Sequence, residues 1–133
     1  MLSDIPAILR AMHQAVDDEP KIVVDPVAPK LIDMTSLDER WLAPILNHPF
    51  APQWRAGFLI RCRYAEDCLR EAVERGITQY LILGAGLDTF SYRQPAWAEA
   101  LRVFEMDHPA TQGFKRERLA AAHLFPACRS FPD

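Results

Sequence analysis

A short apolar segment that ends in a glycine-rich turn constrains the fold of this chain most. Residues 79–83 (Gln-Tyr-Leu-Ile-Leu) are rich in residues that favour β-strands, and Gly84-Ala85-Gly86 follows them directly. A strand that ends in Gly-x-Gly is typical of the first unit of an α/β fold that binds a nucleotide or a cofactor. The sequence therefore predicts an α/β protein with a ligand at this turn.

Two residues of the turn restrict which ligand it suits. A dinucleotide-binding loop carries a third glycine where this chain has Thr89, because the following helix crosses the strand closely there. Asp88 places a carboxylate where a pyrophosphate would lie, and like charges repel. The loop therefore favours a cationic ligand with an adenosine and no phosphates. S-adenosylmethionine meets these conditions, whereas NAD, FAD and ATP meet them poorly.

The next expected strand, residues 102–107 (Arg-Val-Phe-Glu-Met-Asp), ends in carboxylates. Glu105 lies 21 residues after Gly84, and Asp107 lies 23 residues after it. In α/β nucleotide folds a carboxylate about 20 residues past the glycine turn binds the ribose hydroxyls. The alternative is a solvated strand end, but the spacing from the glycine turn favours the ribose interpretation.

Composition and charge bound the class of the protein. The chain has 133 residues, so it forms one domain at most. Its net charge of −3 offers no basic surface for nucleic acid, and no apolar stretch reaches the length of a membrane span. The histidines are scattered, and the odd number of cysteines predicts reduced thiols in a cytoplasmic protein without a zinc site: Cys62, Cys68 and Cys128.

Prolines divide the first 50 residues into short pieces. We expect a helix over about residues 6–16. The capping-box spacing of residues 36–39 should open another short helix, which ends near Asn47. Residues 1–50 are therefore predicted to form a helical cap on a core domain of residues 51–133.

A long helix is predicted between Pro52 and Gly76. Apolar residues recur there at steps of three and four and form one face: Trp54, Phe58, Ala65, Leu69 and Ala72. Arg61 falls in the middle of this face, whereas Arg63 and Glu66 lie on the opposite, polar side. A guanidinium on a core-facing stripe needs an anionic partner or partial hydration. Arg61 therefore pairs with a carboxylate of the sheet, reaches water, or binds the carboxylate of S-adenosylmethionine.

Three stretches of the sequence together resemble the leucine carboxyl methyltransferase-like family, within the class I S-adenosylmethionine-dependent methyltransferases. They are residues 61–67 (RCRYAED), 79–93 (QYLILGAGLDTFSYR) and 103–112 (VFEMDHPATQ), with Lys115 and Arg116 shortly after. The resemblance runs over about residues 25–119, and the bacterial branch is the most similar. It implies a Rossmann-like α/β fold with a mostly parallel sheet and helices on both faces.

By this resemblance the cofactor is S-adenosylmethionine. Arg61 would hold its carboxylate, and Asp107 would bind its ribose. Gly84 and Gly86 would let its methionyl part lie against the backbone. The reaction implied is attack by an oxygen of a small carboxylate or hydroxyl acceptor on the sulfonium methyl group. Neither a catalytic residue nor a metal ligand is assigned in this chain.

Four further residues have expected roles on the same motifs. The family also uses a basic residue of its N-terminal segment, for which Arg10 is the nearest candidate. Asp88 and Arg93 are expected to brace the loop by pairing with each other. His108 is expected to cap the helix that begins at Pro109 rather than to act as a base, since methyl transfer from a sulfonium needs alignment more than proton transfer.

The resemblance covers the N-terminal part of the family fold only. Residues 130–133 suggest an incomplete third strand. We therefore expect a truncated parallel sheet whose open edge exposes four apolar residues: Leu81, Leu83, Val103 and Phe104. The chain should self-associate or aggregate through this edge. A truncated methyltransferase is the favoured interpretation, and a non-catalytic cofactor-binding module or an inactive remnant that needs a partner chain are the alternatives.

Overall fold

The sheet consists of two parallel strands, β1 (Gln79–Leu83) and β2 (Arg102–Met106). The structure is a computed structural model, and it describes residues 5–32, 43–44 and 46–126. The two strands run in the same direction, so the segment between them crosses from the end of β1 back to the start of β2. The prediction of an α/β fold with a parallel sheet is confirmed, and the sheet has two strands within these ranges.

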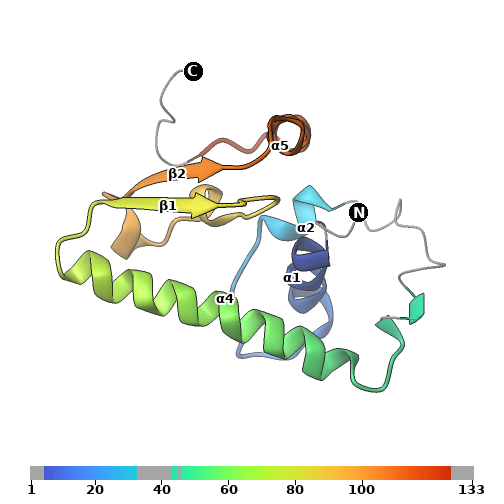
Figure 1. The fold of residues 1–133 in the computed structure, drawn as a ribbon. Helices are drawn as coiled ribbons and strands as arrows, with labels where there is room; N and C mark the ends of the chain where they lie inside the picture. The colour runs from blue at the N-terminus through green and yellow to red at the C-terminus, as the bar shows by residue number, and fades with distance from the viewer. Residues whose placement is uncertain (1–4, 33–42, 45, 127–133) are drawn as a thin grey trace.

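The α-helices in the described ranges lie along one side of the sheet and near the ends of its strands (Figure 1). The long helix α4 (Ala51–Glu74) runs along one side of it, and α5 (Pro109–Ala121) follows β2. The shorter helices α1 (Ile5–Val16) and α2 (Ala28–Leu31) lie beyond the ends at which the strands finish. None of these helices, nor any other in the described ranges, is long and apolar enough to cross a bilayer.

One face of the sheet packs into a core with α4. Strand side chains alternate between faces, so Tyr80 and Ile82 of β1 share a face with Val103 of β2, the register partner of Tyr80. These three residues surround a buried cluster that also takes residues from α4, from the turn and from the segment before β2: Leu69, Phe90, Ala98 and Leu101. The core therefore lies between α4 and the inner face of the sheet.

The other face of the sheet carries exposed apolar side chains. Leu81 is 52%, Leu83 70% and Met106 58% exposed. The prediction that apolar strand residues are exposed is therefore right for Leu81 and Leu83, while Phe104 is half-buried. The prediction is wrong for Val103, because the pleat turns its side chain toward α4 and the inner core.

The ends of α4 follow the signals in the sequence. Pro52 stands in its first turn, where its missing N–H costs nothing. At the other end Gly76 adopts a φ of 95°, a left-handed conformation that favours glycine. The N–H of Gly76 donates to the carbonyl of Val73, and that of Ile77 donates to the carbonyl of Ala72. This pair of bonds is a Schellman motif, which ends the helix at the predicted place.

The buried face of α4 differs from the predicted one. Its fully buried residues are Ala51, Arg55, Leu59 and Leu69. Trp54, Arg61 and Ala65, which were predicted to face the core, are exposed, and Glu66, predicted on the polar side, is half-buried. The prediction failed because the true stripe contains Arg55 and Glu66, whose charges are balanced by side chains far away in the sequence.

The N-terminal helices pack against the turn that follows β1. Leu87 of the turn is buried among residues of α1, of α2 and of the position directly after α2: Ala7, Ile8, Ala11, Ala28 and Ile32. Gln14 of α1 holds the connecting segment, since its amide donates to the carbonyl of Val23 and accepts from the N–H of Asp25. The helix expected over residues 6–16 is confirmed, and the cap positions the turn directly.

Two predictions fall on parts of the chain outside the described residues. The capping box at 36–39 is one, although residues 43–44 and 46 shortly after it have helical backbone. The incomplete strand at 130–133 is the other. The domain boundary at residue 50 also stays a prediction.

Candidate functional site

The glycine turn has the conformation that its sequence predicts. Gly84 adopts a φ of 67° and Gly86 a φ of 51°, in the left-handed region where other residues are strained. A Cβ on Gly84 would have no atom within 4 Å, so the glycine is needed for its conformation rather than for space. The N–H groups of Gly84 and Ala85 donate to the carbonyl of Met106, at 2.8 and 3.2 Å. The turn is thus fastened to the end of β2.

Asp107 closes the turn from the end of β2. Its Oδ2 accepts the N–H of Gly86 at 2.6 Å, and its Oδ1 accepts the N–H of His108 at 2.6 Å. These two bonds, the one from Gly86 foremost, lower the pKa of Asp107 below its usual value, so that it stays ionised. Each oxygen keeps a lone pair for a further donor, such as a ribose hydroxyl.

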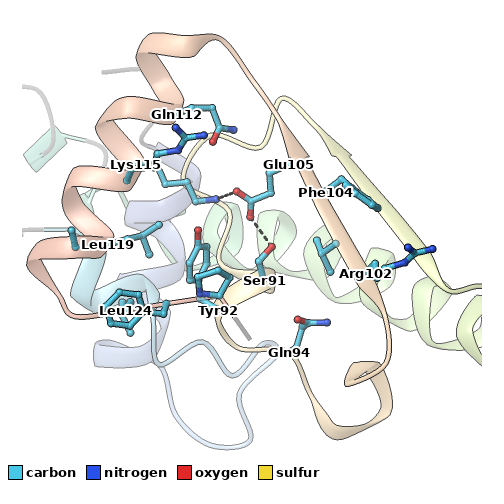
Figure 2. A pocket seen from close by; sticks show the side chains of 15 residues that line it. Ser91, Tyr92, Gln94, Arg102, Phe104, Glu105, Gln112, Lys115, Leu119 and Leu124 are labelled. Atoms are coloured by element: carbon cyan, nitrogen blue, oxygen red, sulfur yellow. Dashed lines mark hydrogen bonds and ion pairs between the residues drawn. The ribbon is translucent and has the colours of Figure 1, made fainter. Parts of the chain in front are cut away.

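Glu105 takes a different position from Asp107, although both had the spacing of a ribose ligand. Its carboxylate lies on the α5 side of β2, where Ser91 donates to Oε1 at 2.8 Å and Lys115 donates to Oε2 at 2.5 Å (Figure 2). Lys115 is 1% exposed. This buried ion pair fastens α5 to β2, and of the two carboxylates with the ribose spacing it leaves Asp107 as the one beside the turn.

A hollow of about 470 Å³ opens beside this ion pair, between β2 and α5 (Figure 2). Burial raises the pKa of Tyr92 most, and the nearby negative charge of Glu105 raises it further, to about 12. The hydroxyl of Tyr92 therefore stays protonated at neutral pH. None of the residues that line the hollow belongs to the glycine turn or is Asp107. The hollow is therefore separate from the candidate cofactor site.

Arg10 reaches the turn from α1, and its role toward a cofactor stays a prediction. It is 4% exposed, and its Nη2 donates to the carbonyl of Leu87 at 2.7 Å. Its Nη1 lies 3.4 Å from Oδ2 of Asp88. Asp88 also accepts the N–H of Phe90 at 2.8 Å. Arg10 therefore holds both the backbone and the acidic side chain of the turn.

The expected pairing of Asp88 with Arg93 is wrong. Arg93 forms a two-pronged ion pair with Glu66 of α4, with N···O distances of 3.2 and 2.5 Å. Although burial disfavours its charge, the hydrogen bond with Glu66 raises the pKa of Arg93. Asp88 is therefore held by Arg10 of α1, and Arg93 is held by Glu66 of α4. The two residues brace the turn through these helices and do not pair with each other.

Arg61 is exposed on α4, and its side chain makes no hydrogen bond or ion pair with the turn or with any other described residue. Of the four predicted cofactor-binding residues, Gly84, Gly86 and Asp107 come together. The roles of all four as ligands stay predictions.

His108 caps α5, as predicted. Its Nδ1 accepts the N–H of Ala110 at 3.2 Å, and Pro109 follows it in the first turn of the helix. Because this cap uses Nδ1 as an acceptor, the ring fixes the start of the helix directly after Asp107. No base function is needed to explain the residue.

Comparison with known proteins supplies the family. A family model described as leucine carboxyl methyltransferase matches residues 5–131. The chain belongs to the leucine carboxyl methyltransferase family. The family prediction is therefore confirmed. The matched residues include the glycine turn, Asp107 and the N-terminal helices α1 and α2.

Curated relatives in several bacteria share 33–44% of the aligned residues with this leucine carboxyl methyltransferase family member. A protein of Mycolicibacterium gilvum is 34% identical over 92% of this chain and 42% of its own length. One of Bacillus subtilis is 44% identical over 64% of this chain and 26% of its own. A Mycobacterium tuberculosis protein is 33% identical over 81% and 33%. All are named "Putative S-adenosyl-L-methionine-dependent methyltransferase", and this chain spans less than half of each.

Sequence reasoning did not predict that several charged residues are buried and join separate elements of the fold. Asp25, Glu66 and Lys115 are buried or half-buried, and each is paired with a residue from another element. Glu66 was predicted on the polar, outward-facing side of α4. Asp25 directly precedes Pro26, which signals an extended backbone there but not a buried carboxylate.

Proposed function

We propose that this chain binds S-adenosylmethionine at the turn between β1 and the short 3-10 helix η2 (Phe90–Tyr92), as part of a methyltransferase. The observation that carries the proposal is the junction of Asp107 with Gly86. It places an ionised carboxylate with free lone pairs at the end of β2, beside a turn in which Gly84 is exposed. The names of the curated relatives supply the same cofactor.

The hydrogen bonding of the turn favours a ligand without phosphates. A phosphate-binding loop aims its free backbone N–H groups at the ligand and leads into a helix. Here five of these groups are already engaged with partners inside the protein, those of Gly84, Ala85, Gly86, Asp88 and Phe90. Moreover, the turn leads into η2, which has only three residues. The carboxylate of Asp88 in the turn also disfavours a phosphate there.

Each predicted ligand has a proposed role toward the cofactor. Asp107 accepts the ribose hydroxyls, and Gly84 and Gly86 allow the methionyl part to approach the backbone. Arg61 binds the methionyl carboxylate. Its guanidinium is exposed and can form a two-pronged contact with a carboxylate.

We further propose O-methyl transfer to a small carboxylate or hydroxyl acceptor. When bound, the cofactor supplies the electrophilic methyl group, so the residues of this chain contribute position and charge. Asp107 and the glycine turn fix the cofactor, while no residue of the described ranges is assigned to the acceptor. The two cysteines described, Cys62 and Cys68, are free thiols, in keeping with the cytoplasmic location that we propose.

Isothermal titration with S-adenosylhomocysteine tests the binding site. Asp107→Ala and Arg61→Ala should each weaken binding roughly ten- to a hundredfold, since each removes a charge-assisted contact. Arg63→Ala is the matched control, because Arg63 lies on the same helix and pairs with Asp67 at 2.9 Å on the surface. Equal losses for Arg61→Ala and Arg63→Ala would contradict the assignment of Arg61.

The exposed strand face favours a second candidate, a cofactor-binding chain that needs a partner for turnover. Leu81, Leu83 and Met106 form an apolar surface on one face of the sheet. We propose that the 133-residue chain associates with a second copy through this surface and does not transfer methyl groups by itself. Purified chain with labelled cofactor and a panel of small carboxylic acids and phenols, with light scattering alongside, tests this. Robust methyl transfer by a monomer would exclude it.

A further inference from the structure

A fully buried carboxylate lies where the cap meets the glycine turn. Asp25 belongs to the segment between α1 and α2 and is 0% exposed. Its Oδ1 accepts the N–H groups of Val27 and Ala28, at 3.1 and 2.9 Å. Its Oδ2 points to the turn, where it accepts the hydroxyl of Thr89 at 2.5 Å. A buried charge of this kind persists only where donors surround it.

Thr89 continues this contact into the rest of the site. It is 0% exposed, and its Oγ1 accepts the Nε–H of Arg93 at 3.0 Å while donating to Asp25. Arg93 in turn pairs with Glu66 of α4. One hydroxyl therefore connects the cap, the turn and the long helix.

Both arginines of the site also surround the same oxygen. The Nε atoms of Arg10 and Arg93 lie 3.5 and 3.4 Å from Oδ2 of Asp25. The Nε of Arg10 is buried and has no hydrogen-bond partner. The hydroxyl of Thr89 is thus the shortest contact that Oδ2 makes, and it is the contact that comes from the turn itself.

We propose that Thr89 and Asp25 are positioning residues that hold the glycine turn in its ligand-binding shape, an inference that rests on the proposed cofactor site. The turn between Gly84 and Thr89 has no regular secondary structure, and two of its residues are glycines with a wide choice of conformations. A buried, charge-assisted hydrogen bond at its far end restricts that choice. Thr89, at the place of a third glycine in dinucleotide-binding loops, acts here as an anchor to the cap.

The substitution Thr89→Val tests the proposal, because valine keeps the shape and removes the hydroxyl. In the ligand-free chain we expect hydrogen exchange of the amides of Gly86, Asp88 and Phe90 to accelerate roughly ten- to a hundredfold, the equivalent of one charge-assisted hydrogen bond. Exchange of the β1 amides should change much less. Thr89→Ser restores the hydroxyl and should return the turn amides to within a few-fold of the wild type.

Binding of S-adenosylhomocysteine provides the second readout. Thr89→Val should weaken it by at least about fivefold, and Thr89→Ser should recover most of the loss. Thr78→Val is the matched control, because Thr78 is exposed just before β1 and its hydroxyl has no partner in the part of the chain that is described. It should leave both readouts unchanged.

Three results would overturn the proposal. The first is unchanged turn exchange in Thr89→Val, and the second is equal acceleration in β1 and the turn. The third is a Thr89→Ser variant that resembles Thr89→Val. If Thr89→Val does not fold, Asp25→Asn replaces it, and equal acceleration in β1 and the turn would again refute the role. A wild-type chain that binds no S-adenosylhomocysteine would refute the proposed function, while the exchange measurement would still decide on Thr89.

Discussion

The contact between α1 and α4 should make the stability of the chain depend on pH in the acid range. Arg55 of α4 donates to both oxygens of Asp17, which follows α1, one of them at 2.7 Å. His13 contacts the same carboxylate with Nδ1 at 2.6 Å. Its Nε2 accepts the N–H of Ile22, so Nδ1 carries the proton. The hydrogen bond from Arg55 lowers the pKa of Asp17 most, and the hydrogen bond from His13 lowers it further. Burial raises this pKa, but the net result is a pKa of about 2, below the usual 3.8.

The size of the effect follows from this pKa. Each pKa unit corresponds to about 1.4 kcal/mol, so the full lowering sets an upper bound of about 2.5 kcal/mol. The side chain of Asp17 is 27% exposed, so solvent screens part of this energy, and we expect about 1 kcal/mol. Because the folded pKa lies below the unfolded one, this stability is present above about pH 4 and is lost as the pH falls toward 2.

Urea denaturation of Asp17→Asn and of the wild type at several pH values measures this contribution. The variant should be less stable by about 1 kcal/mol at pH 7, and the difference should shrink as the pH falls from 4 to 2. Asp18→Asn is the control, since Asp18 is exposed and unpaired among the described residues. A difference that stays constant over this range, or an equal effect of Asp18→Asn, would refute the role of the contact.

Three further predictions concern other parts of the molecule. Gly57→Ala should stabilise the chain by about 1 kcal/mol, because Gly57 is exposed inside α4 with open space where a Cβ would stand. Gly86→Ala should destabilise the chain by about 1–2 kcal/mol, because Gly86 has a φ of 51°. Urea denaturation measures both changes, and the same sign for both would contradict this prediction. Lys115→Met should cost about 3 kcal/mol in the same assay, since it leaves Glu105 without its cation, and an unchanged midpoint would argue against the buried pair. Leu83→Ser should reduce self-association in light scattering while changing stability by less than about 0.5 kcal/mol, and unaltered association would exclude this face.

The sequence predicted the elements well where local signals decide them. Pro52 and Gly76 marked the ends of the long helix because both act through their own backbone geometry. His108 was assigned as a helix cap for the same reason. The glycine turn and Asp107 were found together because their spacing along the chain reflects one strand–turn–strand unit.

The charged interior could not be predicted in the same way. Arg55 lies 38 residues from its partner Asp17, and Glu66 lies 27 from Arg93. An apolar periodicity assigns such residues to the surface, so the predicted face of α4 was rotated away from the true one. Thr89 posed the same difficulty, since its partner Asp25 is 64 residues earlier. Only the fold shows that these charges neutralise each other.

Amide-resolved NMR titration tests the central claim, that the turn and Asp107 bind S-adenosylmethionine rather than a dinucleotide. S-adenosylhomocysteine added to the isotopically labelled chain should shift the amide signals of Gly84, Gly86 and Asp107 in a saturable way, and NADH at the same concentration should not. Shifts caused by NADH alone would contradict the account. So would shifts by S-adenosylhomocysteine that are confined to the hollow between β2 and α5.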